Sequence, residues 1–138
     1  MLKKNQYDRE VEYYSKEIVL NPNDTDAYNN RGIAYDKKGQ YEMAIEDYNK
    51  AIALNPNDVK AYYNRGNAHN DKGQYEIAIE NYSKSIALDP NNAVVYNYRG
   101  LAYYKLGNIG RAISDFQKAC DMGYENGCKN LQKALEKK

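Results

Sequence analysis

Residues 25–58 read TDAYNNRGIAYDKKGQYEMAIEDYNKAIALNPND, and residues 59–92 read VKAYYNRGNAHNDKGQYEIAIENYSKSIALDPNN. The two stretches are identical at 21 of 34 positions, and residues 93–126 keep Gly100 and Gly107 in the same register. Pro22, Pro56 and Pro90 follow the same step of 34 residues. Self-similarity at a fixed period indicates a repeat architecture, in which each unit packs on its neighbours.

Each unit is predicted to contain two helices. The first spans about 25–38 and the second about 41–54, because apolar residues recur there at steps of three, four and seven. Gly39 lies where the first helix must end and reverse, a place that favours a left-handed residue. Asp24 and Asp58 stand just before a first helix and are predicted to be N-caps.

A glycine in the middle of each first helix predicts close helix packing. Gly32, Gly66 and Gly100 recur, although a mid-helix glycine costs up to about 1 kcal/mol relative to alanine. We expect each glycine to let the first helix approach the second closely, opposite a small alanine. The alanines concerned are Ala44, Ala78 and Ala112.

Charge and hydropathy argue against several classes of protein. Lys and Arg total 20 and Asp and Glu total 19, so we expect no nucleic-acid partner. The chain has no run of 18 apolar residues and no secretory signal at its start, so we expect no membrane partner. We expect a soluble, cytoplasmic protein, unless a leader has been removed. A locally basic tail is interpreted as a solvated helix end: Lys129, Lys133, Lys137 and Lys138.

The unit resembles the tetratricopeptide repeat (TPR), and the resemblance covers about residues 7–124. That family's pattern of aromatic, small and proline positions is matched in the first copy by Tyr28, Gly32, Tyr35, Ala44, Tyr48, Ala51 and Pro56. The third copy departs at its end, where Tyr124 takes the proline position. The resemblance implies an all-α fold, a right-handed α-solenoid of antiparallel helix pairs known as the TPR superhelix.

Residues 1–138 are expected to form a single TPR domain with distinctive ends. Residues 1–23 match only a second helix and form a half repeat, and residues 126–138 read as a polar capping helix. Between them lie repeat 1 (24–58), repeat 2 (59–92) and repeat 3 (93–125). This order predicts about eight helices.

The residue inventory argues against catalysis, so we expect neither an enzyme nor a bound cofactor. The chain has one His and two Cys, which are not spaced like the ligands of a zinc site. His69 falls in the column of Tyr35 and Tyr103 and is interpreted as a packing residue. No glycine-rich phosphate loop is present.

Arg31, Arg65 and Arg99 occupy a column in which the TPR family usually has leucine. We interpret them as partners of carboxylates on the second helices, because the guanidinium fork suits a carboxylate. The alternative is contact with a ligand. The candidate partners are Asp47, Glu80 and Asp115.

In the TPR family the first helix of each repeat lines a concave binding surface. Carried over column by column, this implies a peptide-binding surface formed by Asn29, Asn30, Ile33, Lys37, Lys60, Tyr63, Asn64, Asn67, Asn97, Tyr98, Leu101 and Tyr104. Tyr and Asn suit peptide recognition, because they combine aromatic area with amides that pair with backbone. Asn30 and Asn64 match the asparagine ladder of some TPR proteins, and Tyr98 breaks it. Some TPR domains hold the terminal carboxylate of a peptide in a clamp of polar side chains. Of the corresponding positions in this sequence only Asn64 matches, so we do not expect a ligand of that class.

The segment from Cys120 to Cys128 resembles cysteine-rich solenoid relatives of TPR proteins, in which such a pair bridges consecutive helices. The resemblance implies that the two sulfurs lie near each other. A disulfide is possible if the two Cα atoms lie within about 7 Å. In a reducing cytoplasm the residues would be thiols, which is the state we favour.

Two functions fit these patterns. The first is a protein–protein interaction scaffold or adaptor that binds a peptide or partner segment in the concave groove. The alternative is a structural self-assembly module that associates through the ends of its solenoid. The half repeat leaves Tyr7, Val11 and Tyr14 with nothing behind them, which predicts weak self-association through residues 1–20.

Overall fold

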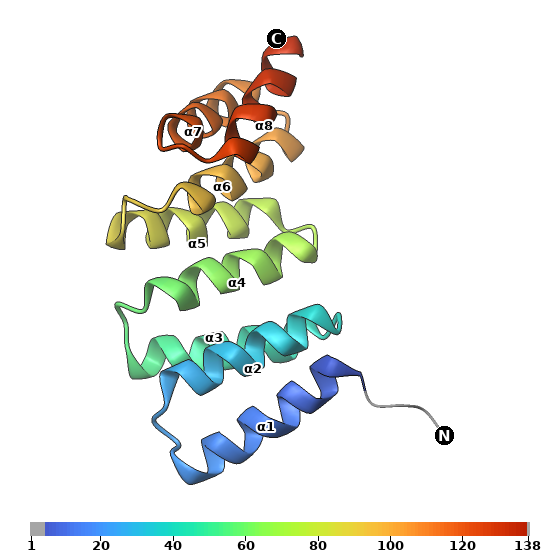
Figure 1. Cartoon of the computed structure of the whole chain (residues 1–138), viewed down its shortest axis with the longest axis vertical. Coiled ribbons are helices and arrows are strands. Elements are labelled where there is room, and N and C mark those ends of the chain that lie inside the picture. Colours follow the sequence, from blue (N-terminus) through green and yellow to red (C-terminus); the bar gives the residue numbers. More distant parts are fainter. Residues whose placement is uncertain (1–4, 138) are drawn as a thin grey trace.

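A computed structural model describes residues 5–137 as eight helices stacked in chain order (Figure 1). They are α1 (Gln6–Leu20), α2 (Thr25–Lys37), α3 (Tyr41–Leu54), α4 (Val59–Asp71), α5 (Tyr75–Leu88), α6 (Ala93–Lys105), α7 (Ile109–Asp121) and α8 (Glu125–Glu136). No strand occurs among the described residues, so the predicted all-α solenoid is confirmed. Residues 1–4 of the predicted half repeat and Lys138 of the predicted cap lie outside the described range.

Each helix packs mainly on the helices before and after it in the sequence. The most extensive contacts pair α2 with α3, α4 with α5 and α6 with α7, and α8 packs on α7. Further contacts join α2 to α4 and α6 to α8. The first helices of consecutive units, α2 and α4, therefore lie side by side, as a groove built from first helices requires.

The predicted helix ends are present. Asp24 Oδ1 accepts a hydrogen bond from the Ala27 N–H at 3.2 Å, and Asp58 Oδ1 accepts one from the Ala61 N–H at 3.2 Å. Gly39, and its equivalents in the next two units, have φ angles of 79°, 79° and 80°. A side chain would be strained at such angles, so glycine suits the reversal between the two helices of a unit.

Each mid-helix glycine packs against an aromatic ring of the second helix. A Cβ atom on Gly66 would lie 2.8 Å from a ring carbon of Tyr82, and the equivalent distances in the first and third units are 2.5 and 2.7 Å. The prediction that these glycines face the alanine column of Ala44 is therefore wrong. The ring of Tyr82, which is fully buried, fills the space between the two helices instead.

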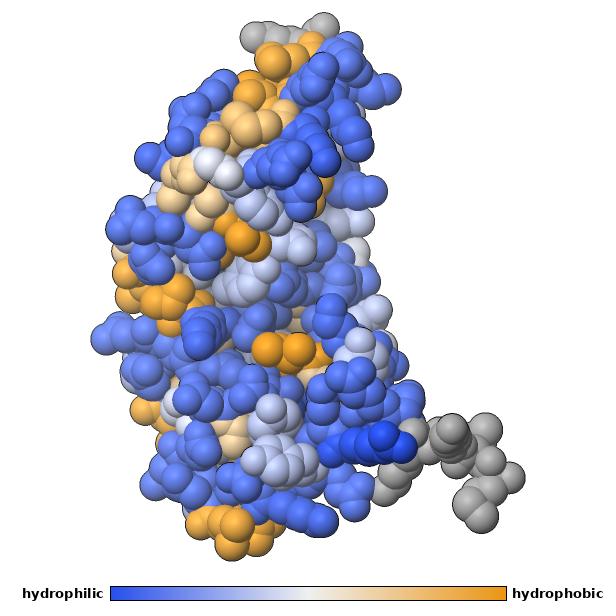
Figure 2. All heavy atoms as spheres, viewed as in Figure 1, coloured by the Kyte–Doolittle hydropathy of each residue, from blue (hydrophilic) through white to orange (hydrophobic). Residues whose placement is uncertain are grey.

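The amino-terminal end of the stack exposes apolar side chains. None of the residues of α1 is buried, and Val19 and Leu20 are 80% and 81% exposed. Figure 2 shows a hydrophobic patch at the lower end of the molecule, over the carboxyl end of α1. The residues predicted to form the open face, Tyr7, Val11 and Tyr14, are half-buried instead.

A disulfide joins the last two helices. The Cα atoms of Cys120 and Cys128 lie 4.5 Å apart, within the limit set above. The structure thus has the bridge rather than the thiols that we favoured for a reducing compartment. Next to it, Gly127 and Ala134 are the buried residues of α8, which leaves most of that helix polar and exposed.

Candidate peptide-binding groove

A hollow of about 300 Å³ lies between α2, α3, α4 and α6, and we call it the central hollow. Six residues of the predicted peptide-binding surface line it: Ile33, Lys37, Tyr63, Asn64, Asn67 and Tyr98. The other lining residues are Asp36, Tyr48, Asn70 and Asp71. Aromatic rings, amides and charged groups from consecutive units therefore converge on one site.

Three tyrosine rings form one wall of the central hollow and the core behind it. The ring centroids of Tyr63 and Tyr98 lie 5.8 Å apart, and those of Tyr63 and Tyr82 lie 6.1 Å apart. Tyr82 donates a hydrogen bond from its hydroxyl to Asn67 Oδ1 at 2.6 Å. Burial raises the pKa of Tyr63 to about 12, so its hydroxyl stays neutral at physiological pH. This wall is rigid and uncharged, which suits an anchor for a ligand side chain.

Two carboxyl groups face each other in the central hollow. Burial, followed by a hydrogen bond and charge repulsion from Asp71, raises the pKa of Asp36 to about 7. Asp36 Oδ1 has less than 1 Å² of accessible surface and no hydrogen-bond partner among the described residues. The sequence did not predict that Asp36 and Asp71 would meet. The two residues are 35 positions apart, so they belong to different columns of the 34-residue repeat.

A second hollow of about 230 Å³ lies nearer the carboxyl end. Leu101 and Tyr104 of the predicted surface line it, together with Lys105 and Phe116. Its remaining lining residues, Asn130 and Lys133, come from α8. The capping helix thus contributes to this hollow, which a column-by-column comparison of the repeats does not reveal.

Two residues of the predicted surface have structural roles instead. Asn29 and Asn97 are each 4% exposed. Asn29 donates to Asp58 Oδ2 at 2.9 Å, and Asn97 accepts from Asn130 Nδ2 at 2.9 Å. Their amides tie each first helix to the next element of the stack and are not available to a ligand.

Asn30 and Lys60, the remaining two residues of the predicted surface, line neither hollow. Asn30 is half-buried, and Lys60 is exposed. Their contribution to binding stays a prediction. Asn64, the second rung of the predicted asparagine ladder, does line the central hollow.

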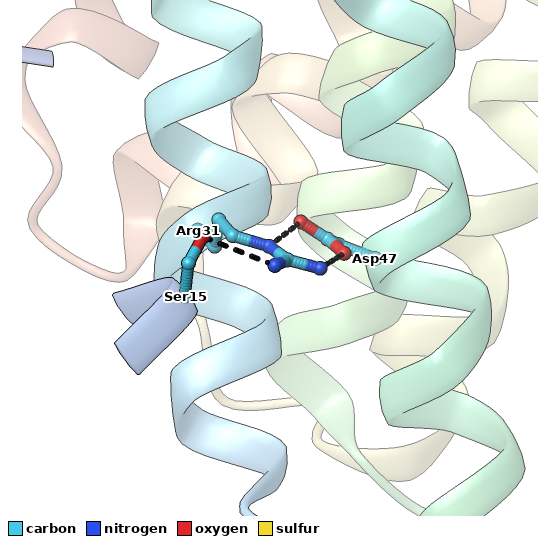
Figure 3. A network of polar contacts seen from close by, with 3 residues as sticks. All are labelled: Ser15, Arg31 and Asp47. Atoms are coloured by element: carbon cyan, nitrogen blue, oxygen red, sulfur yellow. Dashed lines mark hydrogen bonds and ion pairs between the residues drawn. The ribbon is translucent and has the colours of Figure 1, made fainter. Parts of the chain in front are cut away.

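The arginine column joins neighbouring units. Arg31 Nε and Nη2 donate to the two oxygens of Asp47 at 2.9 and 2.7 Å, and Nη1 donates to Ser15 Oγ at 3.2 Å (Figure 3). Arg99 repeats this arrangement with Asp115 and Ser83. Each of these guanidinium groups therefore holds three consecutive helices together, which confirms the interpretation of Arg31 and Arg99 as partners of carboxylates.

Arg65 lacks the carboxylate that its equivalents have. It donates to Asn81 Oδ1 at 2.7 Å and to Asn49 Oδ1 at 2.9 Å. The predicted partner, Glu80, is wrong, because the step of 34 residues places Asn81 in the column of Asp47 and turns the exposed Glu80 elsewhere. Burial lowers the pKa of Arg65, whereas the hydrogen bond that Arg31 donates to Asp47 raises the pKa of Arg31.

The remaining candidates for chemistry are accounted for locally. His69 Nδ1 lies 2.8 Å from Gln74 Oε1, at the turn between α4 and α5. Among the described residues, no group of three His, Cys, Asp or Glu side chains is arranged to hold a metal ion. Within residues 5–137, no helix is both long and apolar enough to span a membrane.

Four family models match the chain in overlapping segments. Three are described as tetratricopeptide repeat and match residues 25–58, 47–80 and 93–126. The fourth, described as TPR repeat, matches residues 66–107. Together they span residues 25–126, which include α2 to α7. A search of curated protein sequences found no match.

Two solved structures share the fold. One, described as the MamA RS-1 ArsTM double mutant, has a TM-score of 0.76 at 28% identity and covers 84% of this chain. This chain covers 65% of that protein. A crystal structure of MamA also has a TM-score of 0.76, at 23% identity. The aligned region covers 99% of this chain and 96% of the MamA chain. Both support the helical-repeat fold.

The arginine column predicts the effect of one substitution. Asn81→Asp gives Arg65 the carboxylate that Arg31 and Arg99 already have, so we expect the free energy of unfolding to rise by about 0.5–1 kcal/mol. The reverse change at an equivalent position, Asp47→Asn, serves as the matched control and should lower it. Urea denaturation followed by circular dichroism measures both. A lower midpoint for Asn81→Asp would show that the column does not act as an ion-pair ladder.

Proposed function

The chain belongs to the tetratricopeptide-repeat family, and we propose that it is an interaction scaffold that binds a peptide segment of a partner protein in its concave groove. The observation that supports this most is the central hollow. Six side chains that were predicted to bind a peptide, from three successive first helices, meet around it. Tyr63, Tyr98 and Ile33 also pack against the core, so the same side chains fix the shape of the hollow and line it.

The hollow offers the groups that a peptide needs. The side chains of Asn64 and Asn70 line the hollow, and each carries both a donor and an acceptor for a peptide unit. Asn67 accepts from the Tyr82 hydroxyl, and its amide also forms a hydrogen bond with the Tyr63 side chain, so it helps to hold both rings in place. Tyr63 and Tyr98 provide flat apolar area beside these amides. A peptide could thus be held by its backbone and anchored by one side chain.

We assign binding rather than catalysis to this site. The hollow holds no His, Cys or Ser, so it offers no ordinary nucleophile–base pair. The chain has a formal net charge of +1, which gives no broad electrostatic attraction to nucleic acid. A protein partner fits these properties best.

The groove proposal is tested by the double variant Asn30→Ala, Asn64→Ala. Neither amide has a packing role, so the melting temperature should stay within the range of about 0.5 kcal/mol per site expected for surface changes. Affinity for the partner should fall by about 1–3 kcal/mol, since each lost amide leaves a peptide group without its hydrogen bond. The partner is first identified by affinity capture and mass spectrometry, and calorimetry then measures binding.

Asn57→Ala, in the exposed turn between α3 and α4, is the matched control and should leave both quantities unchanged. The two single variants show whether Asn30, which lies outside the central hollow, contributes at all. A collapse of stability in the double variant would make these residues structural. Unchanged affinity would place the partner elsewhere on the surface.

Self-assembly through the amino-terminal end is the second candidate function. Val19, Leu20 and Tyr13 are 80%, 81% and 59% exposed on α1, next to the end of the stack. Apolar side chains gathered in this way often form contacts. Light scattering should then show a mass that rises with concentration, and Val19→Ser, Leu20→Ser should abolish the rise. A mass that stays monomeric up to about millimolar concentration would exclude this function.

A further inference from the structure

The carboxyl groups of Asp36 and Asp71 meet in the central hollow without a cation between them. Asp36 comes from the carboxyl end of α2, and Asp71 is the last residue of α4. Their side chains are close enough to share a hydrogen bond. Two carboxylates at this distance repel each other unless a proton or a cation lies between them. In the free protein a proton on Asp36 relieves this repulsion, and a bound cation would take the place of that proton.

One oxygen of this pair is left without any partner. Asp36 Oδ1 is one of two buried side-chain polar atoms that make no hydrogen bond within the described residues. The other, Asn29 Oδ1, belongs to an amide that already holds Asp58. A buried acceptor without a donor is costly, so native proteins rarely retain one without a reason. Asp36 Oδ1 differs from Asn29 Oδ1 because its carboxyl group lines an open hollow.

The surroundings of the pair are mostly uncharged. The titratable groups around it are Lys37 on α2, Tyr48 on α3, Tyr63 on α4, Tyr82 on α5 and Tyr98 on α6. Burial raises the pKa of both Tyr48 and Tyr82, so these phenols stay neutral. Lys37 is exposed, and its charge is the smallest influence on Asp36. The central hollow is therefore an acidic site with aromatic walls.

We propose that Asp36 and Asp71 bind a basic side chain, lysine or arginine, of the partner segment. The inference rests on the proposed function, because it names the side chain that the groove accepts. An ammonium or guanidinium group in the hollow would remove the repulsion between the two carboxylates. The rings of Tyr63 and Tyr98 in the same hollow would cover the alkyl stem and attract the cation.

This arrangement makes binding depend on pH in a defined direction. The pKa of Asp36 is about 7, so Asp36 is mostly protonated at pH 6 and mostly ionised at pH 8. A cation competes with that proton, and lysine and arginine keep their charge over this range. Affinity for a basic probe should therefore rise from pH 6 to pH 8, by up to about tenfold. His69 lies against Gln74 and does not line the hollow.

The test uses the full chain and four matched probe peptides of sequence acetyl-Ala-Ser-X-Ser-Ala-amide, where X is lysine, arginine, norleucine or glutamate. Titrations followed by amide NMR shifts measure binding and locate it. We expect the lysine or the arginine peptide to bind at least about fivefold more tightly than the norleucine peptide. The largest shifts should fall on residues of the central hollow, and the comparison of lysine with arginine identifies the preferred base.

The preference for a base, and its dependence on pH, should disappear in Asp36→Asn, Asp71→Asn. That variant loses a repulsive pair, so it should remain folded, and its amide spectrum checks this directly. The control is Asp26→Asn, which removes one carboxylate from an exposed site on α2, as Asp71→Asn alone does from α4, and should keep the preference. Asp71→Asn alone, at an exposed position, repeats the test with the smallest change to the fold.

Two results would overturn the inference, and they differ in what they imply for the groove. If all four peptides shift the hollow equally, or if the preference survives in the double variant, the pair does not select a base and the groove proposal still stands. If no peptide shifts residues of the hollow at any concentration reached, both the basic side chain and the groove proposal are wrong.

Discussion

The contact between a glycine of each first helix and an aromatic ring of the following second helix determines how the rest of the chain is arranged. Gly66 and Tyr82 approach so closely that a Cβ atom would overlap the ring. The ring is therefore held in one place, and its hydroxyl donates a hydrogen bond to Asn67, the residue after Gly66. In the unit before, the ring of Tyr48 reaches the central hollow in the same way. The residues that pack the helices thus also form the floor of the proposed site.

A second set of repeated contacts joins the units to one another. The guanidinium group of Arg31 bridges Ser15 and Asp47. Arg99, two repeats later in the chain, bridges Ser83 and Asp115 in the same way. Because a repeat protein is stabilised by each unit and by each interface between units, such bridges carry stability from one unit to the next. The repeated side chains are therefore occupied by the fold. Several positions that differ between repeats, among them Asn64, Asn67 and Tyr98, line the central hollow instead.

The sequence predicted the helices, their caps and the reversals at glycine, because these depend on neighbours within one unit and recur with the period. It failed where a side chain finds its partner across units. Asn29 and Asn97 were predicted to bind a peptide, but their partners, Asp58 and Asn130, come from the next turn and from the capping helix. Asp36 and Asp71 meet although they are 35 positions apart, so no alignment of repeats pairs them. The exposure of Val19 and Leu20 at the end of α1 likewise depends on how α1 packs on the rest of the stack.

The central claim is that the repeated positions build the scaffold and the positions of the central hollow bind the partner. The most direct test is NMR cross-saturation from the captured partner to the full chain. The account predicts that saturation reaches residues of α2, α4 and α6 around the central hollow and leaves the arginine column unaffected. Saturation confined to α1, or to the face that carries Arg31, Arg65 and Arg99, would contradict it.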